Sequence, residues 1–126
     1  MNYMNIKKDI LIIDDKPTIA KVVSLYLSDE FNFTYFNSAI KAIAWLHEGN
    51  IPDLIITDLR MPEMTGTELL EYVKANKLFK DIPVVILSSE NSSGERIKLF
   101  SKGAEDYIIK PFNPLELKLR VKKILH

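Results

Sequence analysis

Several common sources of structure and binding are missing from this sequence, and each absence narrows its possible functions. It has no cysteine, which excludes disulfides and thiolate chemistry. No apolar run approaches the ~20 residues of a membrane-spanning helix, and residues 1–8 lack the apolar stretch of a signal peptide. Lys and Arg together number 17, as do Asp and Glu, so no charge excess favours nucleic acid or an acidic membrane. We predict a cytoplasmic protein without membrane contact or direct nucleic-acid binding.

The composition that is present fits one folded domain. The chain has 126 residues, of which 47% are hydrophobic and 27% charged. This length can bury one sizeable core, and no repeat or linker divides it. We predict a single domain over residues 1–126 with its core at about 9–125.

Short apolar runs rich in β-branched residues alternate with segments of helical spacing. The runs predict strands at Ile10–Ile13, Phe33–Phe36, Leu54–Thr57, Val84–Leu87 and Tyr107–Ile109, of which the second is the weakest. Apolar residues at helical spacing follow in 19–27, 40–47 and 69–73. Helix signals agree: Pro17 suits a first turn, Ser38 and Asn113 suit N-caps, and Gly49 suits a C-terminal stop. The last segment also alternates like a strand, but its cap favours a helix.

Five strand–helix units predict an α/β fold. We expect a single doubly wound five-stranded parallel sheet, flavodoxin-like, with strand order 2-1-3-4-5 and helices on both faces. In such sheets ligands bind beyond the carboxyl ends of the strands. The residues that end the strands are therefore the candidates for function.

Polar side chains end four of the predicted strands. Asp14 and Asp15 follow the first, Asp58 the third, Ser88 the fourth and Lys110 the fifth. Crowded carboxylates repel one another, and a hard divalent cation such as Mg²⁺ relieves this. A lysine can pair with a carboxylate or with a phosphoryl oxygen, and a carboxylate can act as a nucleophile. Together these groups supply what phosphoryl transfer requires.

Taken singly, each residue has a simpler interpretation. Asp14 and Asp15 could cap the following helix, Asp58 could be a loop carboxylate, and Ser88 could form a turn. Lys110 is harder to explain in this way, because a lysine that ends a buried strand needs a negative partner. The coincidence at four strand ends favours a shared site.

Four motifs resemble the receiver domain of bacterial response regulators, including the stand-alone chemotaxis regulator. They are IIDDKP, DLRMPEMTG, VVILSSE and GAEDYIIKPF, and the similarity runs from about Ile10 to Ile124. The resemblance implies a two-component signalling switch that is phosphorylated by a sensor histidine kinase or a histidine phosphotransfer domain. It implies no enzymatic activity beyond self-phosphorylation and self-dephosphorylation. Either a complete single-domain regulator or a fragment of a longer protein would fit.

The resemblance also implies a role for each motif residue. Asp58 would accept the phosphoryl group, and Mg²⁺ or Mn²⁺ would be held by Asp15, Asp14, Asp58 and the backbone carbonyl of Arg60. Ser88 and Lys110 would contact the phosphoryl group, and the bond from Lys110 to Pro111 would be cis. Tyr107 would be the aromatic residue that switches position. Taken alone, a tyrosine such as Tyr107 is more often a packed core or rim aromatic than a switch. Phosphorylation would reshape the face formed by the fourth helix, fifth strand and fifth helix.

Two positions depart from the common pattern of that family. Arg60 lies two residues after Asp58, and Glu90 two after Ser88. We predict that their opposite charges bring them together, shield the site and lengthen the lifetime of the phosphoryl group. Lys16 replaces an acidic residue often found there, so the metal site should be less negative.

Two rival functions use the same fold. One is an interaction module that is never phosphorylated, although such modules usually lack some of the acidic and lysine residues present here. The other is a flavin protein, which would need a phosphate loop after the first strand, where Asp14 and Asp15 would repel a phosphate. The sequence contains neither a G-x-G-x-x-G motif nor a P-loop, which argues against nucleotide binding.

Overall fold

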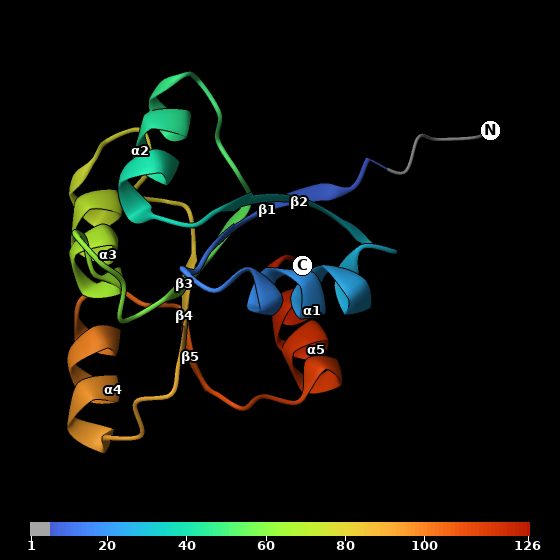
Figure 1. Cartoon of the computed structure of the whole chain (residues 1–126). Helices are drawn as coiled ribbons and strands as arrows, with labels where there is room; N and C mark the ends of the chain where they lie inside the picture. The colour runs from blue at the N-terminus through green and yellow to red at the C-terminus, as the bar shows by residue number, and fades with distance from the viewer. Residues whose placement is uncertain (1–5) are drawn as a thin grey trace.

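A computed structural model describes residues 6–126 as five strands that alternate with five helices. Figure 1 shows the strands as a central layer between two layers of helices. In chain order the elements are β1 (Lys8–Ile13), α1 (Pro17–Leu27), β2 (Phe31–Phe36), α2 (Ala39–His47), β3 (Leu54–Asp58), α3 (Gly66–Ala75), β4 (Val84–Ser88), α4 (Ser93–Ser101), β5 (Asp106–Ile109) and α5 (Pro114–Ile124).

The sheet is parallel throughout, in the order β2-β1-β3-β4-β5. This confirms the predicted α/β fold and its strand order. Every residue of β3 and β4 is buried, as expected for central strands covered on both faces. β1 and β3 are neighbours although a helix, a strand and another helix separate them in sequence. The direction in which successive strands are added to the sheet therefore reverses between β1 and β3. Such folds bind ligands at the point of this reversal.

Two hydrophobic cores lie on opposite faces of the sheet. Alternate strand residues point to opposite faces, so Leu11 and Ile13 enter one core while Ile10 and Ile12 enter the other. The first core contains the buried side chains of α2, α3 and α4, and the second those of α1 and α5. In Figure 1 the same helices lie on the left and right of the sheet.

Most helix signals in the sequence are confirmed. Pro17 opens α1, Ser38 accepts a hydrogen bond from the Lys41 amide, and Asn113 caps α5 through the amides of residues 115 and 116. Gly49 has a φ of 101° just after α2, a conformation that glycine adopts without a Cβ penalty.

The alternative in which Asp15 caps α1 is wrong. The N-cap residue is Lys16, which makes no side-chain capping hydrogen bond. The Lys16 amide instead donates to the Asp14 carboxylate at 2.8 Å. Asp15 is thus left available for another role.

Two neighbouring strands, β1 and the edge strand β2, begin earlier than predicted. β1 begins at Lys8 and β2 at Phe31, because the exposed Lys8 and Asp9 pair in register with Phe31 and Asn32. Hydrophobic patterning cannot detect exposed polar residues that join a sheet through hydrogen bonds. Within residues 6–126, no helix has the length and apolar character needed to traverse a bilayer.

Candidate functional site

Three carboxylates meet at the carboxyl edge of the sheet. Asp14 directly follows β1, and Asp58 is the last residue of β3, the neighbouring strand. One carboxylate oxygen from each of Asp14, Asp15 and Asp58 lies within 4.8 Å of the other two. Asp14 and Asp58 are only 1% and 6% exposed, so their charges are poorly screened by water.

Lys110 reaches the same group of carboxylates from the end of β5. Its Nζ lies 2.9 Å from Asp14 Oδ2 and 3.5 Å from Asp58 Oδ1. The lysine backbone is fixed by its amide, which donates to the Ser88 carbonyl, and its peptide bond to Pro111 is cis, as predicted. One ammonium group therefore offsets part of the charge of two buried carboxylates.

The site retains an acceptor that the protein leaves unsatisfied. Asp15 Oδ1 is buried and has no hydrogen-bond partner among the described residues. The Lys16 ammonium is 3.8 Å away, beyond hydrogen-bonding distance, and its side chain is 68% exposed. Buried oxygens normally have a partner, and three converging carboxylates form the hard-oxygen donor set that Mg²⁺ or Mn²⁺ prefers. These residues fit a divalent cation.

The two oxygens of Asp58 have different surroundings. Oδ1 accepts a hydrogen bond from the Leu59 amide at 2.8 Å, whereas Oδ2 receives none from the residues that the structure describes. Burial raises the pKa of Asp58 above its ordinary value, and the Asp14 charge adds to the increase, while Lys110 and the Leu59 amide oppose it. A carboxylate of raised pKa is less stabilised as an anion and more basic, which suits a nucleophile.

A chain of contacts leads from the site along the loop after β4. The buried Ser88 hydroxyl accepts a hydrogen bond from the Glu90 amide at 3.0 Å. The Glu90 carbonyl accepts one from the Tyr107 hydroxyl at 2.9 Å, and its carboxylate pairs with Arg60 at 3.0 Å. The predicted approach of Arg60 and Glu90 is therefore present. Tyr107 is only 6% exposed and packs with the core under α4.

Three supporting residues were given no role in the site by the sequence, although Gly66 was expected to serve a turn or a helix entry, and it does begin α3. Thr57 is buried and donates to the Asp58 carbonyl at 2.9 Å. Gly66 opens α3 against the backbone of Asp58, and Tyr35 on β2 donates to the Asp14 carbonyl at 2.6 Å. The sequence indicated a turn or helix entry at Gly66 but not its contact with the Asp58 backbone. No sequence pattern connects a tyrosine on an edge strand with an aspartate after another strand.

Known proteins share both the sequence and the fold. The family model described as "Response regulator receiver domain" matches residues 10–122. Two-component response regulator ORR5 of Oryza sativa subsp. japonica is 39% identical over 117 residues, which are 92% of this chain and 87% of that protein. A putative response regulator from Chloroflexus aurantiacus has a crystal structure that superposes with a TM-score of 0.88 at 33% identity, covering 95% of this chain and 98% of that one.

A longer protein contains a similar segment. Histidine kinase P4 of Formosa agariphila is 38% identical over 119 residues, which are 94% of this chain but only 9% of that kinase. Similar sequences therefore occur both in proteins of about this length and as small parts of much larger ones.

Proposed function

This chain belongs to the response regulator receiver domain family of two-component signalling, and on that premise we propose that it is a phosphorylation-activated switch with Asp58 as the phosphoryl acceptor. Receiver domains of this kind receive signals from histidine kinases. The observation that carries the proposal is the meeting of Asp14, Asp15, Asp58 and Lys110 at one sheet edge, since this provides a nucleophile, a cation site and a charge clamp together.

The transfer step follows from the state of each group. Asp58 Oδ2 attacks the phosphorus of a phosphohistidine on a sensor kinase or phosphotransfer domain. A new O–P bond forms as the P–N bond breaks, and the electron pair of that bond remains on the imidazole nitrogen, which then takes a proton from water. The Leu59 amide holds Oδ1 during attack, and Lys110 Nζ neutralises charge on the transferring group.

The acidic residues have a second role in this scheme. Asp14, Asp15 and Asp58, with the backbone carbonyl of Arg60, would hold Mg²⁺ or Mn²⁺. When bound, the cation would supply positive charge to the phosphoryl oxygens. The unsatisfied Asp15 Oδ1 supports this assignment, because a cation would give that oxygen a partner.

The response to phosphorylation involves Ser88 and Tyr107. The phosphoryl group accepts a hydrogen bond from the Ser88 hydroxyl and draws it toward Asp58. Ser88 and Tyr107 are both connected to Glu90, so a movement of that loop reaches the aromatic ring. The ring is buried here, so we propose that the unphosphorylated protein also populates a form with Tyr107 turned outward, and that phosphorylation favours the buried form.

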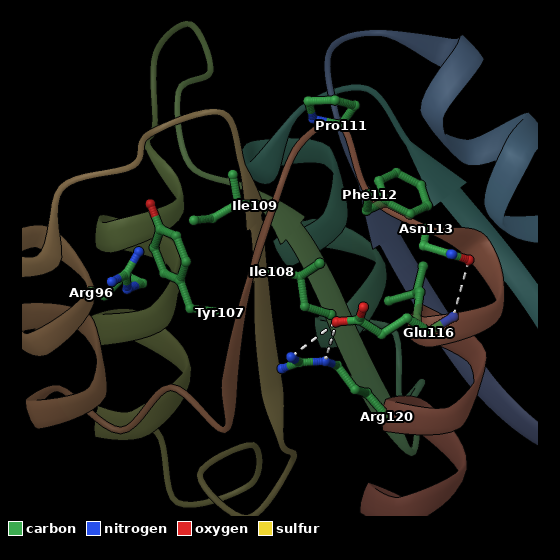
Figure 2. Close-up of a pocket in the computed structure, with 10 residues that line it drawn as sticks. Arg96, Tyr107, Ile108, Ile109, Pro111, Phe112, Asn113, Glu116 and Arg120 are labelled. Atoms are coloured by element: carbon green, nitrogen blue, oxygen red, sulfur yellow. Dashed lines mark hydrogen bonds and ion pairs between the residues drawn. The ribbon is translucent and has the colours of Figure 1, made fainter.

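The face formed by α4, β5 and α5 is the proposed output surface. A cavity of about 330 Å³ lies on this face. Figure 2 shows Tyr107 and Arg96 on one side of it and Phe112 and Arg120 on the other. Ile97 and Leu119, from the same two helices, are each 68% exposed. Because Tyr107 lines this cavity, a change in its position changes the surface offered to an output domain or a target protein.

The proposal is tested by phosphorylation of the purified chain. With acetyl phosphate and Mg²⁺, the wild type should gain the mass of one phosphoryl group through a bond that hydroxylamine cleaves, and chelation of Mg²⁺ should prevent it. Asp58→Asn should remain unlabelled. Asp53→Asn is the matched control, because Asp53 is exposed near the opposite end of β3 and should label normally. Labelled Asp58→Asn protein would overturn the assignment, and an unlabelled wild type would favour an interaction module that works without phosphorylation.

In this proposal the chain is not an enzyme with a released product. It catalyses only its own phosphorylation and dephosphorylation. The single domain over residues 1–126 and the cytoplasmic location stay predictions from the sequence.

A further inference from the structure

The edge strand β2 contacts the acidic site through a tyrosine. Tyr35 is directly opposite Ile12 in the β1–β2 register, two residues before Asp14. Its ring packs against the core under α1, and its hydroxyl donates to the Asp14 carbonyl at 2.6 Å. A phenol is protonated at neutral pH, because its ordinary pKa is about 10, so this hydroxyl is a donor there.

Asp14 is held by β2 through both of its backbone polar groups. Its amide donates to the Phe36 carbonyl at 3.2 Å, and its carbonyl accepts from the Tyr35 hydroxyl. A peptide group is planar, so fixing the Asp14 carbonyl also fixes the amide and Cα of Asp15. The direction in which Asp15 projects its carboxylate is therefore coupled to the Tyr35 hydroxyl.

Asp15 has few other constraints. Its buried Oδ1 has no hydrogen-bond partner within the described residues, and Lys16 approaches only to 3.8 Å from a largely exposed position. An exposed ion pair of that length contributes little to orientation. By contrast, Asp14 Oδ1 and Oδ2 are both held, by the Lys16 amide and by Lys110. The orientation of Asp15 thus depends mainly on its backbone.

We propose that Tyr35 is a positioning residue for the cation site, acting through the Asp14–Asp15 peptide to aim the Asp15 carboxylate at the cation. The inference rests on the proposed function, because it assigns Asp15 to the cation. It adds a residue outside the strand ends and makes the edge strand part of the site. Outer residues that orient metal ligands commonly change metal affinity by roughly 10–100-fold when they are replaced.

Tyr35→Phe tests the proposal, because it removes the hydroxyl and keeps the ring. In metal-free protein, the NMR signals of the Asp15 and Lys16 amides should shift. In a Mg²⁺ titration followed by amide shifts, the dissociation constant should rise by roughly tenfold. Tyr26→Phe is the matched control: it makes the same chemical change on α1, at a side chain that is 41% exposed, and should leave both measurements unchanged.

Different outcomes separate the possible failures. A Tyr35→Phe protein with wild-type Mg²⁺ affinity overturns the positioning role, and a lower unfolding midpoint with unchanged affinity assigns the hydroxyl to stability alone. Unchanged Asp15 and Lys16 amide signals also overturn it, whatever the affinity. A wild type that binds no Mg²⁺ overturns both the positioning role and the cation assignment. Labelling of Asp58 is a separate measurement, so failure of the positioning role can be told apart from failure of the proposed phosphorylation.

Discussion

At the scale of single residues, the role proposed for Asp58 comes with a cost in stability. It is 6% exposed, lies near the Asp14 carboxylate and has its pKa raised chiefly by burial. A raised pKa means that the folded protein holds this proton more tightly than the unfolded chain, where the ordinary value is 3.8. The favourable contribution of the protonated group is therefore complete below that value and is lost as the pH rises through the folded-state pKa.

This sign predicts that Asp58→Asn stabilises the protein in the absence of metal. At about pH 7 the variant removes a poorly solvated charge while Lys110 keeps its closer partner, Asp14, so the unfolding midpoint should rise by a few degrees. Toward about pH 4 the gap should narrow, because the wild-type carboxyl is increasingly protonated. Thermal unfolding in a chelating buffer checks this, and a variant less stable than the wild type at pH 7 would contradict it.

The pair formed by Arg60 and Glu90 is expected to act on kinetics rather than on stability. The Arg60 side chain is 68% exposed and that of Glu90 is 36% exposed, and ion pairs this accessible contribute ~0–1 kcal/mol. Arg60 is two residues after Asp58 in the chain, and the proposed role of the pair is to limit the approach of water to that carboxylate. Arg60→Ala should lose its phosphoryl group severalfold faster than the wild type, with little change in unfolding midpoint.

The charge-exchanged double variant is the control for this pair. Arg60→Glu with Glu90→Arg can restore the contact, so it should recover much of the wild-type half-life. Hydrolysis followed by intact mass after removal of the donor measures all three proteins. Equal half-lives for wild type and Arg60→Ala would refute the shielding role.

At the scale of elements, the sequence predicted the strands well and the helices unevenly. β3 and β4 are continuous apolar runs because they are buried on both faces, and each was predicted to within one residue. No helical segment was predicted from pattern for α4, which has a single buried residue, Leu99, and therefore little periodicity. The convergence of the candidate site residues was predictable, because parallel strands end at one edge. The contact of Tyr35 was not, because it depends on the register between β1 and β2.

The entry into α3 explains why residue 66 is glycine. A Cβ built on Gly66 would lie 2.3 Å from the Asp58 carbonyl oxygen and 2.9 Å from the Leu59 Cα. Both are backbone atoms of the proposed phosphorylation site, and the Gly66 amide also donates to the Leu59 carbonyl at 2.8 Å. The start of α3 can therefore pack this closely only without a side chain.

Gly66→Ala should consequently disturb both stability and the site. Overpacking of this kind costs about 1–3 kcal/mol, and any relief must move α3 or the Asp58 backbone. Gly94→Ala is the matched control: Gly94 lies in α4, where a built Cβ would lie 3.6 Å from Ser92 Oγ, an ordinary van der Waals contact. Alanine there should be neutral or favourable by up to ~1 kcal/mol. Denaturant unfolding and the rate of labelling by acetyl phosphate measure both effects. Equal stability of the two variants would contradict the packing argument.

At the scale of the whole molecule, the sheet gathers residues that are far apart in sequence. Lys110 and Asp14 are separated by 96 positions, yet their side chains form a hydrogen bond of 2.9 Å. Two cores, one on each face, hold the strands that carry these residues. Binding at the carboxyl edge therefore engages β1, β3 and β5 together, and a ligand of the folded site should stabilise the molecule as a unit rather than one loop.

Mg²⁺ should accordingly raise the unfolding midpoint of the entire chain. A ligand that binds only the folded state at ten times its dissociation constant stabilises it by ~1.4 kcal/mol, which corresponds to roughly 5 °C for a domain of this size. Calorimetry with Mg²⁺, compared with NaCl of equal ionic strength, isolates the specific effect from screening. Asp15→Asn should lose most of the gain, since it removes the carboxylate whose Oδ1 has no hydrogen-bond partner within residues 6–126. If Asp15→Asn gained as much as the wild type, the cation would be bound outside the three-carboxylate site.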